Sequence, residues 1–130
     1  MTHSIEDLHV YLRNISADKR TSLSVLSSLV KPSTLVLDLG CGSGALGQYL
    51  ATHHSCVIDG LTLSEVEAAH ARPYYRHVHV SDLETCDLSA QFSNHTYDYI
   101  VCADVLEHLR KPERILDACR QLLSPTGQLL

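Results

Sequence analysis

The sequence lacks a long hydrophobic run, a secretory leader and an excess of positive charge. No stretch of the 130 residues approaches the ~20 consecutive apolar residues that a membrane-spanning helix needs. The first residues include Glu6 and Asp7 and do not show the basic-then-apolar pattern of a secretory signal. The net charge is −5, which provides no basic stripe for a phosphate backbone. We therefore predict a cytoplasmic protein without a membrane or nucleic-acid partner.

The chain also lacks a cysteine pairing pattern and a metal-ligand pattern. Its five cysteines include no C-x-x-C pair, and Cys56, Cys102 and Cys119 lie in apolar segments, so we expect free, buried thiols. Nine histidines are present, and His77 and His79 share one strand face, but no spacing supplies four metal ligands. No metal site is predicted.

Length and hydrophobic periodicity predict a single domain over residues 1–130, because the chain is 45% hydrophobic and too short for two cores. Helical spacing of apolar residues marks residues 1–33, and strand and helix patterns alternate through a sheet core over residues 34–130. The expected strands are residues 34–39, 56–61, 76–81 and 97–103 and a fifth from Gln128, and the expected helices are residues 45–52, 65–72 and 112–123. Residues 85–96 are expected to form a polar loop. This alternation predicts a parallel sheet.

Chain connectivity predicts the order of the strands. Right-handed crossovers and a switch point beside the first strand give the order 3-2-1-4-5, with a ligand beyond the carboxyl ends of strands one and four. The fifth strand then has an exposed flank, and we expect a homodimer contact or another partner to cover it.

A glycine-rich turn directly follows the first strand. Residues 34–47 read TLVLDLGCGSGALG. Gly40, Gly42 and Gly44 let the backbone take positive φ and approach a ligand closely, and Asp38 places a carboxylate at the tip of the strand. This combination predicts a pocket for a ligand that carries positive charge.

The same turn also fits a dinucleotide-binding pattern. Gly42, Gly44 and Gly47 read as G-x-G-x-x-G between a strand and a helix, which keeps an NAD-dependent oxidoreductase as a weaker alternative. A pyrophosphate would lie close to Asp38, and two desolvated anions at that separation repel strongly. S-adenosylmethionine has no phosphate and carries an ammonium and a sulfonium group, so the acidic residue favours it.

Four segments, in this order, resemble the motifs of class I S-adenosylmethionine-dependent methyltransferases. They are residues 36–44 (VLDLGCGSG), 78–84 (VHVSDLE), 97–109 (YDYIVCADVLEHL) and 122–130 (LLSPTGQLL). The resemblance implies a Rossmann-like three-layer α/β/α sandwich, S-adenosylmethionine as methyl donor and S-adenosylhomocysteine as product. The family's sheet normally continues through a sixth and a seventh strand. We therefore expect this sequence to be the front part of a longer protein, truncated before strands 6 and 7.

The resemblance also implies which residues bind the donor. The methionine end maps to the glycine turn, its preceding acid and the residue after strand four, which are Asp38, Gly40, Cys41, Gly42, Gly44 and Ala103. Asp82 matches the residue that contacts the adenine amino group, and Leu83 would supply a backbone N–H and apolar cover. Turn geometry alone for the glycines, and a capping or solvated role for Asp82, are the alternatives.

The second strand departs from the family pattern. Most members end it with an acidic residue that binds both ribose hydroxyls, whereas this chain has Thr62, a weaker acceptor, followed by Leu63. The segment GLTLS resembles the cyclopropane and mycolic-acid synthase branch, in which a following glutamine assists, and Glu67 stands at that position here. Glu67 either supplies the missing carboxylate or only closes a capping box with Ser64. Asp59 lies on the opposite strand face, and its role stays open.

Methyl transfer is an in-line displacement that needs alignment and, for a hydroxyl acceptor, removal of a proton. His108 is the candidate general base, because an imidazole suits proton transfer near neutral pH; a structural role in its loop is the alternative. Glu107 would orient an acceptor, and Tyr11 would cover the donor or simply pack. We predict a methyltransferase acting on a small polar acceptor, at oxygen. A donor-binding module without catalysis is the alternative.

Overall fold

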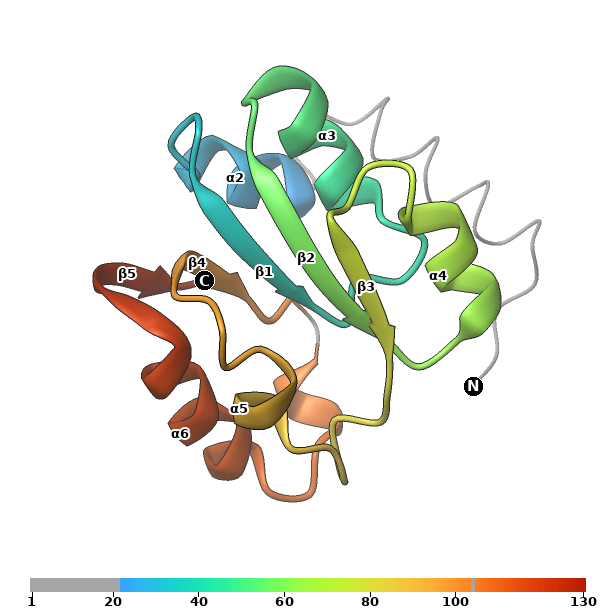
Figure 1. Cartoon of the computed structure of the whole chain (residues 1–130), viewed down its shortest axis with the longest axis vertical. Coiled ribbons are helices and arrows are strands. Elements are labelled where there is room, and N and C mark those ends of the chain that lie inside the picture. The colour runs from blue at the N-terminus through green and yellow to red at the C-terminus, as the bar shows by residue number, and fades with distance from the viewer. Residues whose placement is uncertain (1–21, 104) are drawn as a thin grey trace.

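The computed structural model describes residues 22–103 and 105–130, which form a five-stranded sheet with the order β3-β2-β1-β4-β5 (Figure 1). The strands are β1 (Leu35–Leu39), β2 (Val57–Thr62), β3 (His77–Val80), β4 (Tyr97–Val101) and β5 (Leu123–Leu129). All neighbouring strands are parallel, so the predicted order and direction are confirmed. Tyr11 and the predicted helical region before residue 22 lie outside the described residues.

The helices other than α5 fall where the sequence predicts them. The helices of the described residues are α2 (Ser22–Leu29), α3 (Ala45–His53), α4 (Glu65–Ala71), α5 (Leu88–Gln91), the short 3-10 helix η1 (Leu106–His108) and α6 (Pro112–Leu122). The bounds of α3, α4 and α6 differ from the predicted ones by one residue at most. Ser64 begins α4 by accepting a hydrogen bond from the Glu67 N–H at 3.3 Å, and Pro112 suits the first turn of α6.

The segment predicted as a polar loop contains α5. The Asp87 side chain caps this helix by accepting a hydrogen bond from the Ala90 N–H at 3.2 Å. Leu88 and Phe92 are buried in the apolar core. These two side chains therefore hold a mostly polar segment against the sheet, an interaction that a local polarity pattern does not reveal.

β5 begins earlier than predicted. Leu123 already pairs with Tyr97 of β4, and the register then shifts so that Gln128 pairs with Tyr99. The irregularity thus lies inside the strand, between Leu123 and Gln128. The prediction of a strand from Gln128 is thus correct for the second half of β5 and wrong for its start.

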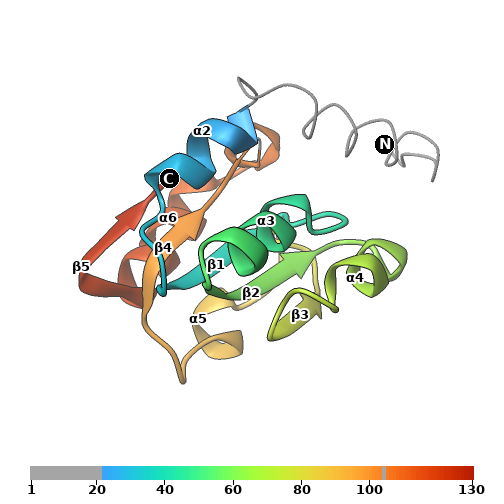
Figure 2. The ribbon, with the colours of Figure 1, turned by 90° about the horizontal axis from the view of Figure 1, so that it is seen from above.

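Helices cover both faces of the sheet, with α3 on one side and α5 on the other (Figure 2). Val36 of β1 packs in one apolar cluster with Leu46 and Leu50 of α3, whereas its neighbour Leu37 packs in a second cluster with Ile115 of α6. Successive residues of β1 therefore point to opposite layers, as strand geometry requires. This confirms the three-layer α/β/α sandwich.

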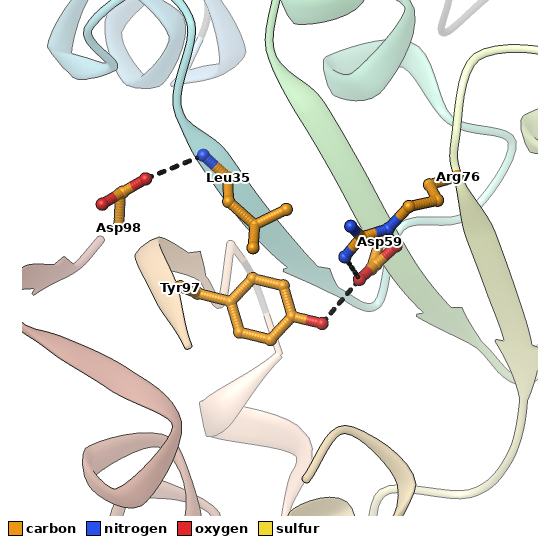
Figure 3. A network of polar contacts seen from close by, with 5 residues as sticks. All are labelled: Leu35, Asp59, Arg76, Tyr97 and Asp98. Atoms are coloured by element: carbon orange, nitrogen blue, oxygen red, sulfur yellow. Dashed lines mark hydrogen bonds and ion pairs between the residues drawn. The ribbon is translucent and has the colours of Figure 1, made fainter. Parts of the chain in front are cut away.

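A buried polar network connects the strands (Figure 3). Asp59 of β2 accepts hydrogen bonds from the Arg76 guanidinium, at 3.0 Å to Oδ1 and 2.6 Å to Oδ2, and from the Tyr97 hydroxyl at 2.6 Å. Burial raises the pKa of Asp59, but these hydrogen bonds outweigh it and hold the pKa below its ordinary value. In the same view, Asp98 accepts a hydrogen bond from the Leu35 N–H at 2.9 Å. Asp59, whose role the sequence left open, therefore links β2 to β4 and to the start of β3.

The five cysteines are free thiols, as predicted. Four of them are buried, and Cys86 is half-buried. A hydrogen bond with Cys119 of α6 and burial raise the pKa of the Cys102 thiol. Cys102 therefore stays neutral and packs as a small apolar side chain.

The sheet of the described residues ends at β5 on one side and at β3 on the other. Pro125, Thr126 and Gln128 of β5 are exposed. The exposed flank predicted for the fifth strand is thus present. In residues 22–103 and 105–130, no helix has both the length and the apolar character that crossing a membrane requires.

Candidate functional site

The candidate site lies at the carboxyl end of β1, where the chain turns into α3. Gly40, Gly42 and Gly44 have φ angles of 73°, 56° and 92°, in the region that favours glycine. The N–H groups of Gly40 and Cys41 donate to the Leu61 carbonyl oxygen at 2.8 and 2.9 Å. The glycine turn therefore has the predicted left-handed backbone and is fixed to the end of β2.

Two further segments lie against this turn. A Cβ atom added to Gly40 would lie 2.5 Å from Cγ2 of Val105, and one added to Gly42 would lie 2.9 Å from Oε2 of Glu67. Burial and then the negative charges of Asp38 and Glu67 raise the pKa of the Cys41 thiol. The ends of β1, β2 and β4 thus meet at one place, with two carboxylates beside the turn.

Asp38 is more enclosed than the sequence indicates. Its side chain is only 4% exposed, and its Oδ2 accepts a hydrogen bond from the Tyr75 hydroxyl at 2.7 Å. Burial raises the pKa of Asp38 to about 7, and the hydrogen bond from Tyr75 partly opposes that rise. The carboxylate at the strand tip therefore lies inside the protein and has a protein partner.

Tyr75 is the residue that sequence reasoning missed. It lies between α4 and β3, and its hydroxyl also accepts a hydrogen bond from the Gly47 N–H at 3.1 Å. Its ring lies 2.1 Å from the position of a Cβ at Gly47 and 2.9 Å from that of a Cβ at Gly60. The third glycine of the dinucleotide pattern thus makes room for an aromatic side chain. No local pattern connects residues 47, 60 and 75, so only the fold reveals their contact.

The end of β2 presents one buried and two more accessible candidates. Thr62 is 3% exposed, whereas the following Leu63 is 71% exposed. The Glu67 N–H is bound by Ser64, while the Glu67 carboxylate lies against Gly42. The structure therefore brings the Glu67 carboxylate to the glycine turn and does not direct it only to its own helix cap. A contact with the ribose stays a prediction.

The segment after β3 places Asp82 at the surface and Leu83 in the core. Asp82 is exposed, and its Oδ1 accepts a hydrogen bond from the Glu84 N–H at 2.9 Å. Leu83 is buried, its carbonyl accepts a hydrogen bond from Arg114, and it lines a hollow of about 310 Å³ with Arg110 and Arg114. Asp82 thus lies as an exposed acid in a turn, which matches the solvated role considered for it, and an adenine contact stays a prediction.

The segment after β4 holds the remaining candidates. Ala103 is half-buried and packs on the cluster that contains Val101. His108 ends η1 with a largely exposed side chain, and its Nε2 lies 3.7 Å from Oε1 of Glu107. Asp104 lies outside the described residues. A catalytic role for His108 stays a prediction.

The described residues contain no group of three or more histidine, cysteine, aspartate or glutamate side chains placed to hold a metal ion. His77 is exposed, and His79 packs edge-on against Phe92 with ring centroids 4.9 Å apart.

The sequence matches one protein-family model, described as a methyltransferase domain, over residues 37–129. The matched range begins inside β1 and includes the glycine turn and the four other strands.

Curated relatives come from several bacteria. The chain is 32% identical over 99 residues to a ubiquinone biosynthesis O-methyltransferase of Neisseria meningitidis and 34% identical over 100 residues to one of Coxiella burnetii. Each match covers 72% of this chain and 41% of the relative. The chain therefore spans about two fifths of the length of the curated relatives that it matches.

Solved structures have the same fold. The sugar N-methyltransferase KedS8 from Streptoalloteichus aligns with a TM-score of 0.71 at 21% identity, over 99% of this chain and 53% of its own. A TehB-like S-adenosylmethionine-dependent methyltransferase from Corynebacterium glutamicum aligns with a TM-score of 0.68 at 24% identity, over 95% and 69%. A methyltransferase from Geobacter sulfurreducens, in complex with S-adenosyl-L-homocysteine, aligns with a TM-score of 0.65 at 21% identity, over 92% and 53%. The chain belongs to the methyltransferase domain family, with the Rossmann-like fold of the S-adenosylmethionine-dependent enzymes.

Proposed function

We propose that this chain binds S-adenosylmethionine and transfers its methyl group to an oxygen atom of a small polar acceptor. The observation that carries the proposal is the glycine turn at the carboxyl ends of β1, β2 and β4, with the Asp38 and Glu67 carboxylates beside it. A diphosphate would place further negative charge near both acids, whereas an ammonium and a sulfonium would be attracted. This disfavours the NAD-dependent alternative.

The donor supplies an electrophilic methyl group when it is bound. We assign its methionine end to the glycine turn and its neighbours, namely Asp38, Gly40, Cys41, Gly42, Gly44 and Ala103. We assign its ribose to Thr62 or Glu67, and its adenine to Leu63, Asp82 and Leu83. The exposed Leu63 side chain offers apolar surface to a base, and the Glu67 carboxylate offers two acceptor oxygens to a diol.

We assign removal of the acceptor proton to His108. Its imidazole is exposed and lies beside the Glu107 carboxylate, so it is open to solvent for proton exchange. The relatives named as O-methyltransferases support oxygen as the methylated atom. The rival, a module that binds the donor without catalysis, differs only in this last step, because it would bind the donor equally well.

Calorimetric titration with S-adenosylmethionine, S-adenosylhomocysteine and NAD tests the donor. We expect binding of the first two ligands and none of NAD. Transfer of a radiolabelled methyl group to a panel of phenols, sugars and other small hydroxyl compounds then distinguishes the enzyme from the module. Binding of NAD with refusal of both sulfur-containing ligands would overturn the proposal.

Asp82→Ala is expected to weaken S-adenosylhomocysteine binding by about 1 to 3 kcal/mol, because a hydrogen bond to the adenine amino group is lost. Asp87→Ala is the matched control, since Asp87 is also an exposed acid that caps a backbone N–H. Both variants lose a local cap, and only the first should lose affinity in calorimetry. Equal affinities would remove Asp82 from the site.

Glu67→Gln is expected to weaken donor binding by about 1 to 2 kcal/mol if its carboxylate accepts the ribose hydroxyls. Glu65→Gln is the control, because Glu65 belongs to the same helical turn and forms an exposed ion pair with Arg72 at 2.6 Å. If Glu67→Gln binds the donor as tightly as the unchanged protein, the ribose contact is assigned to Thr62 instead. Introducing glutamate at position 62 is a poor test, since Thr62 is buried and a new charge there would be desolvated.

Two further points of the proposal concern a partner for the exposed flank of β5 and the cellular location. An unpaired strand edge can pair with another strand, so we propose that a second copy or another partner covers β5. Light scattering that finds only a monomer at high concentration would count against a homodimer. The cytoplasmic location stays a prediction.

A further inference from the structure

One tyrosine hydroxyl connects the acid of β1 to the first turn of α3. The Tyr75 hydroxyl donates to Oδ2 of Asp38 at 2.7 Å and accepts from the Gly47 N–H at 3.1 Å. Tyr75 itself is 6% exposed. Its two hydrogen bonds therefore use both the donor and an acceptor position of the hydroxyl inside the protein.

The ring of Tyr75 is held as firmly as its hydroxyl. A Cβ added at Gly44, Gly47 or Gly60 would lie 3.0, 2.1 or 2.9 Å from a ring atom. The glycine turn, the body of α3 and the end of β2 thus enclose the aromatic ring. A ring enclosed in this way has little freedom to rotate. Its packing therefore fixes the position of the hydroxyl that donates to Asp38.

Among residues 22–103 and 105–130, the other groups that act on Asp38 supply no charge to balance it. Cys41 of the glycine turn and Cys102 after β4 are close enough to interact electrostatically with Asp38, and burial raises the pKa of both thiols, so both are neutral. The second acid of the site, Glu67, adds negative charge near Cys41. Tyr75 is therefore the group shown to stabilise the charged form of Asp38.

We infer that Tyr75 is a positioning residue for the methyl donor: its hydroxyl keeps Asp38 oriented and charged for the cationic amino end of the ligand. This inference rests on the proposed function. A hydrogen bond donated to a carboxylate favours its ionised form, and only the ionised form attracts a cation. Donor binding should therefore strengthen as the pH rises through the titration of Asp38.

Tyr75→Phe tests the inference, because phenylalanine keeps the ring in its slot and removes the hydroxyl. The midpoint of the pH dependence of S-adenosylhomocysteine binding is expected near pH 7 in the unchanged protein, where the pKa of Asp38 is about 7. It should move upward by about one pH unit in Tyr75→Phe, which corresponds to the loss of one hydrogen bond to a charged group. Binding at pH 7 should weaken roughly fivefold, as the competent fraction falls.

Tyr97→Phe is the matched control. Tyr97 also donates to a buried aspartate, Asp59, at 2.6 Å, but that aspartate belongs to the network with Arg76 and not to the glycine turn. Its removal should lower stability and leave the midpoint of donor binding unmoved. Equal midpoints in Tyr75→Phe and the unchanged protein would overturn the inference. Equal shifts in Tyr75→Phe and Tyr97→Phe would also overturn it, since they would indicate general loosening.

A second measurement needs no variant. In the unchanged protein, the carboxyl carbon resonance of Asp38 should titrate near pH 7, and its midpoint should fall when S-adenosylhomocysteine is added, because the ligand favours the charged form. A ligand that binds without moving this midpoint would overturn the inference and leave the proposed function standing. Failure of the unchanged protein to bind the ligand at any pH would overturn both.

Discussion

Asp38→Asn is expected to stabilise the folded chain at pH 8 while it weakens donor binding severely. Burial raises the pKa of Asp38 from 3.8 to about 7, so the folded state binds a proton more tightly than the unfolded state. Stability should therefore fall as the pH rises from about 4 to about 7 and stay level above that range. Asparagine carries no charge and still accepts a hydrogen bond from Tyr75. At about 1.4 kcal/mol per pKa unit, the gain at pH 8 is roughly 2 to 4 kcal/mol.

Urea unfolding at pH 5 and pH 8, with calorimetry of S-adenosylhomocysteine on the same samples, measures both effects. Asp59→Asn is the opposite control: Asp59 is equally buried, but its pKa lies below the ordinary value because Arg76 and Tyr97 bind its charged form. That variant should lose stability at pH 8. An Asp38→Asn protein that is less stable at pH 8 than the unchanged chain would contradict the prediction.

The contrast between these two aspartates is itself informative. Asp59 has a bidentate cation and a hydroxyl, which offset its burial. Among the described residues, Asp38 has the Tyr75 hydroxyl and two neutral thiols nearby and no cation. Its ionised form therefore lowers the stability of the folded chain. Residues that destabilise a fold through a perturbed pKa are often retained for a ligand. An onium group is the ligand that would balance this charge.

Gly44→Ala is expected to lower the free energy of unfolding by roughly 2 to 4 kcal/mol. The residue has a φ of 92°, and a left-handed conformation costs an L-residue about 1 kcal/mol. In addition, the new Cβ would lie 2.8 Å from Cα and Cβ of Ala71. One of these atoms belongs to the backbone at the end of α4. The overlap can therefore be relieved only if the helix moves, which adds about 1 to 3 kcal/mol. Urea unfolding at pH 7 gives the measurement.

Gly42→Ala separates strain from overlap. Gly42 also has a positive φ, of 56°, but within the described part of the chain its added Cβ would meet only the end of the flexible Glu67 side chain. It should cost about 1 to 2 kcal/mol in stability and should weaken donor binding by displacing Glu67. Equal losses of stability in the two alanine variants would show that the contact with Ala71 is unimportant.

The sheet was predictable because short local sequence patterns indicate its strands and most of its connecting helices. Continuous apolar strands, the Ser64 cap and Pro112 are each readable within a few residues, and the order of the strands follows from the handedness of the connections. The exceptions depend on distant partners. α5 forms because Leu88 and Phe92 reach the core, and β5 begins at Leu123 because Tyr97 of β4 is there to pair with it.

The candidate site was predictable where backbone geometry decides it. Three glycines close together predict a turn with positive φ, and the structure has one. Glu67 was identified from the resemblance to the cyclopropane and mycolic-acid synthase branch, and its carboxylate lies at the turn. The burial of Asp38 and its bond to Tyr75 were not predictable, because they depend on a contact between residues 37 positions apart in the chain.

Tyr75 packs against Gly44, Gly47 and Gly60, so substitutions at these four positions should depend on one another. A methyl group at position 47 would overlap the ring, so a homologue with alanine there should carry a smaller side chain at position 75. A smaller residue at 75 also removes the hydroxyl beside Asp38, so such a homologue would have to anchor its acid by another donor. Changes at these sites should therefore be inherited together.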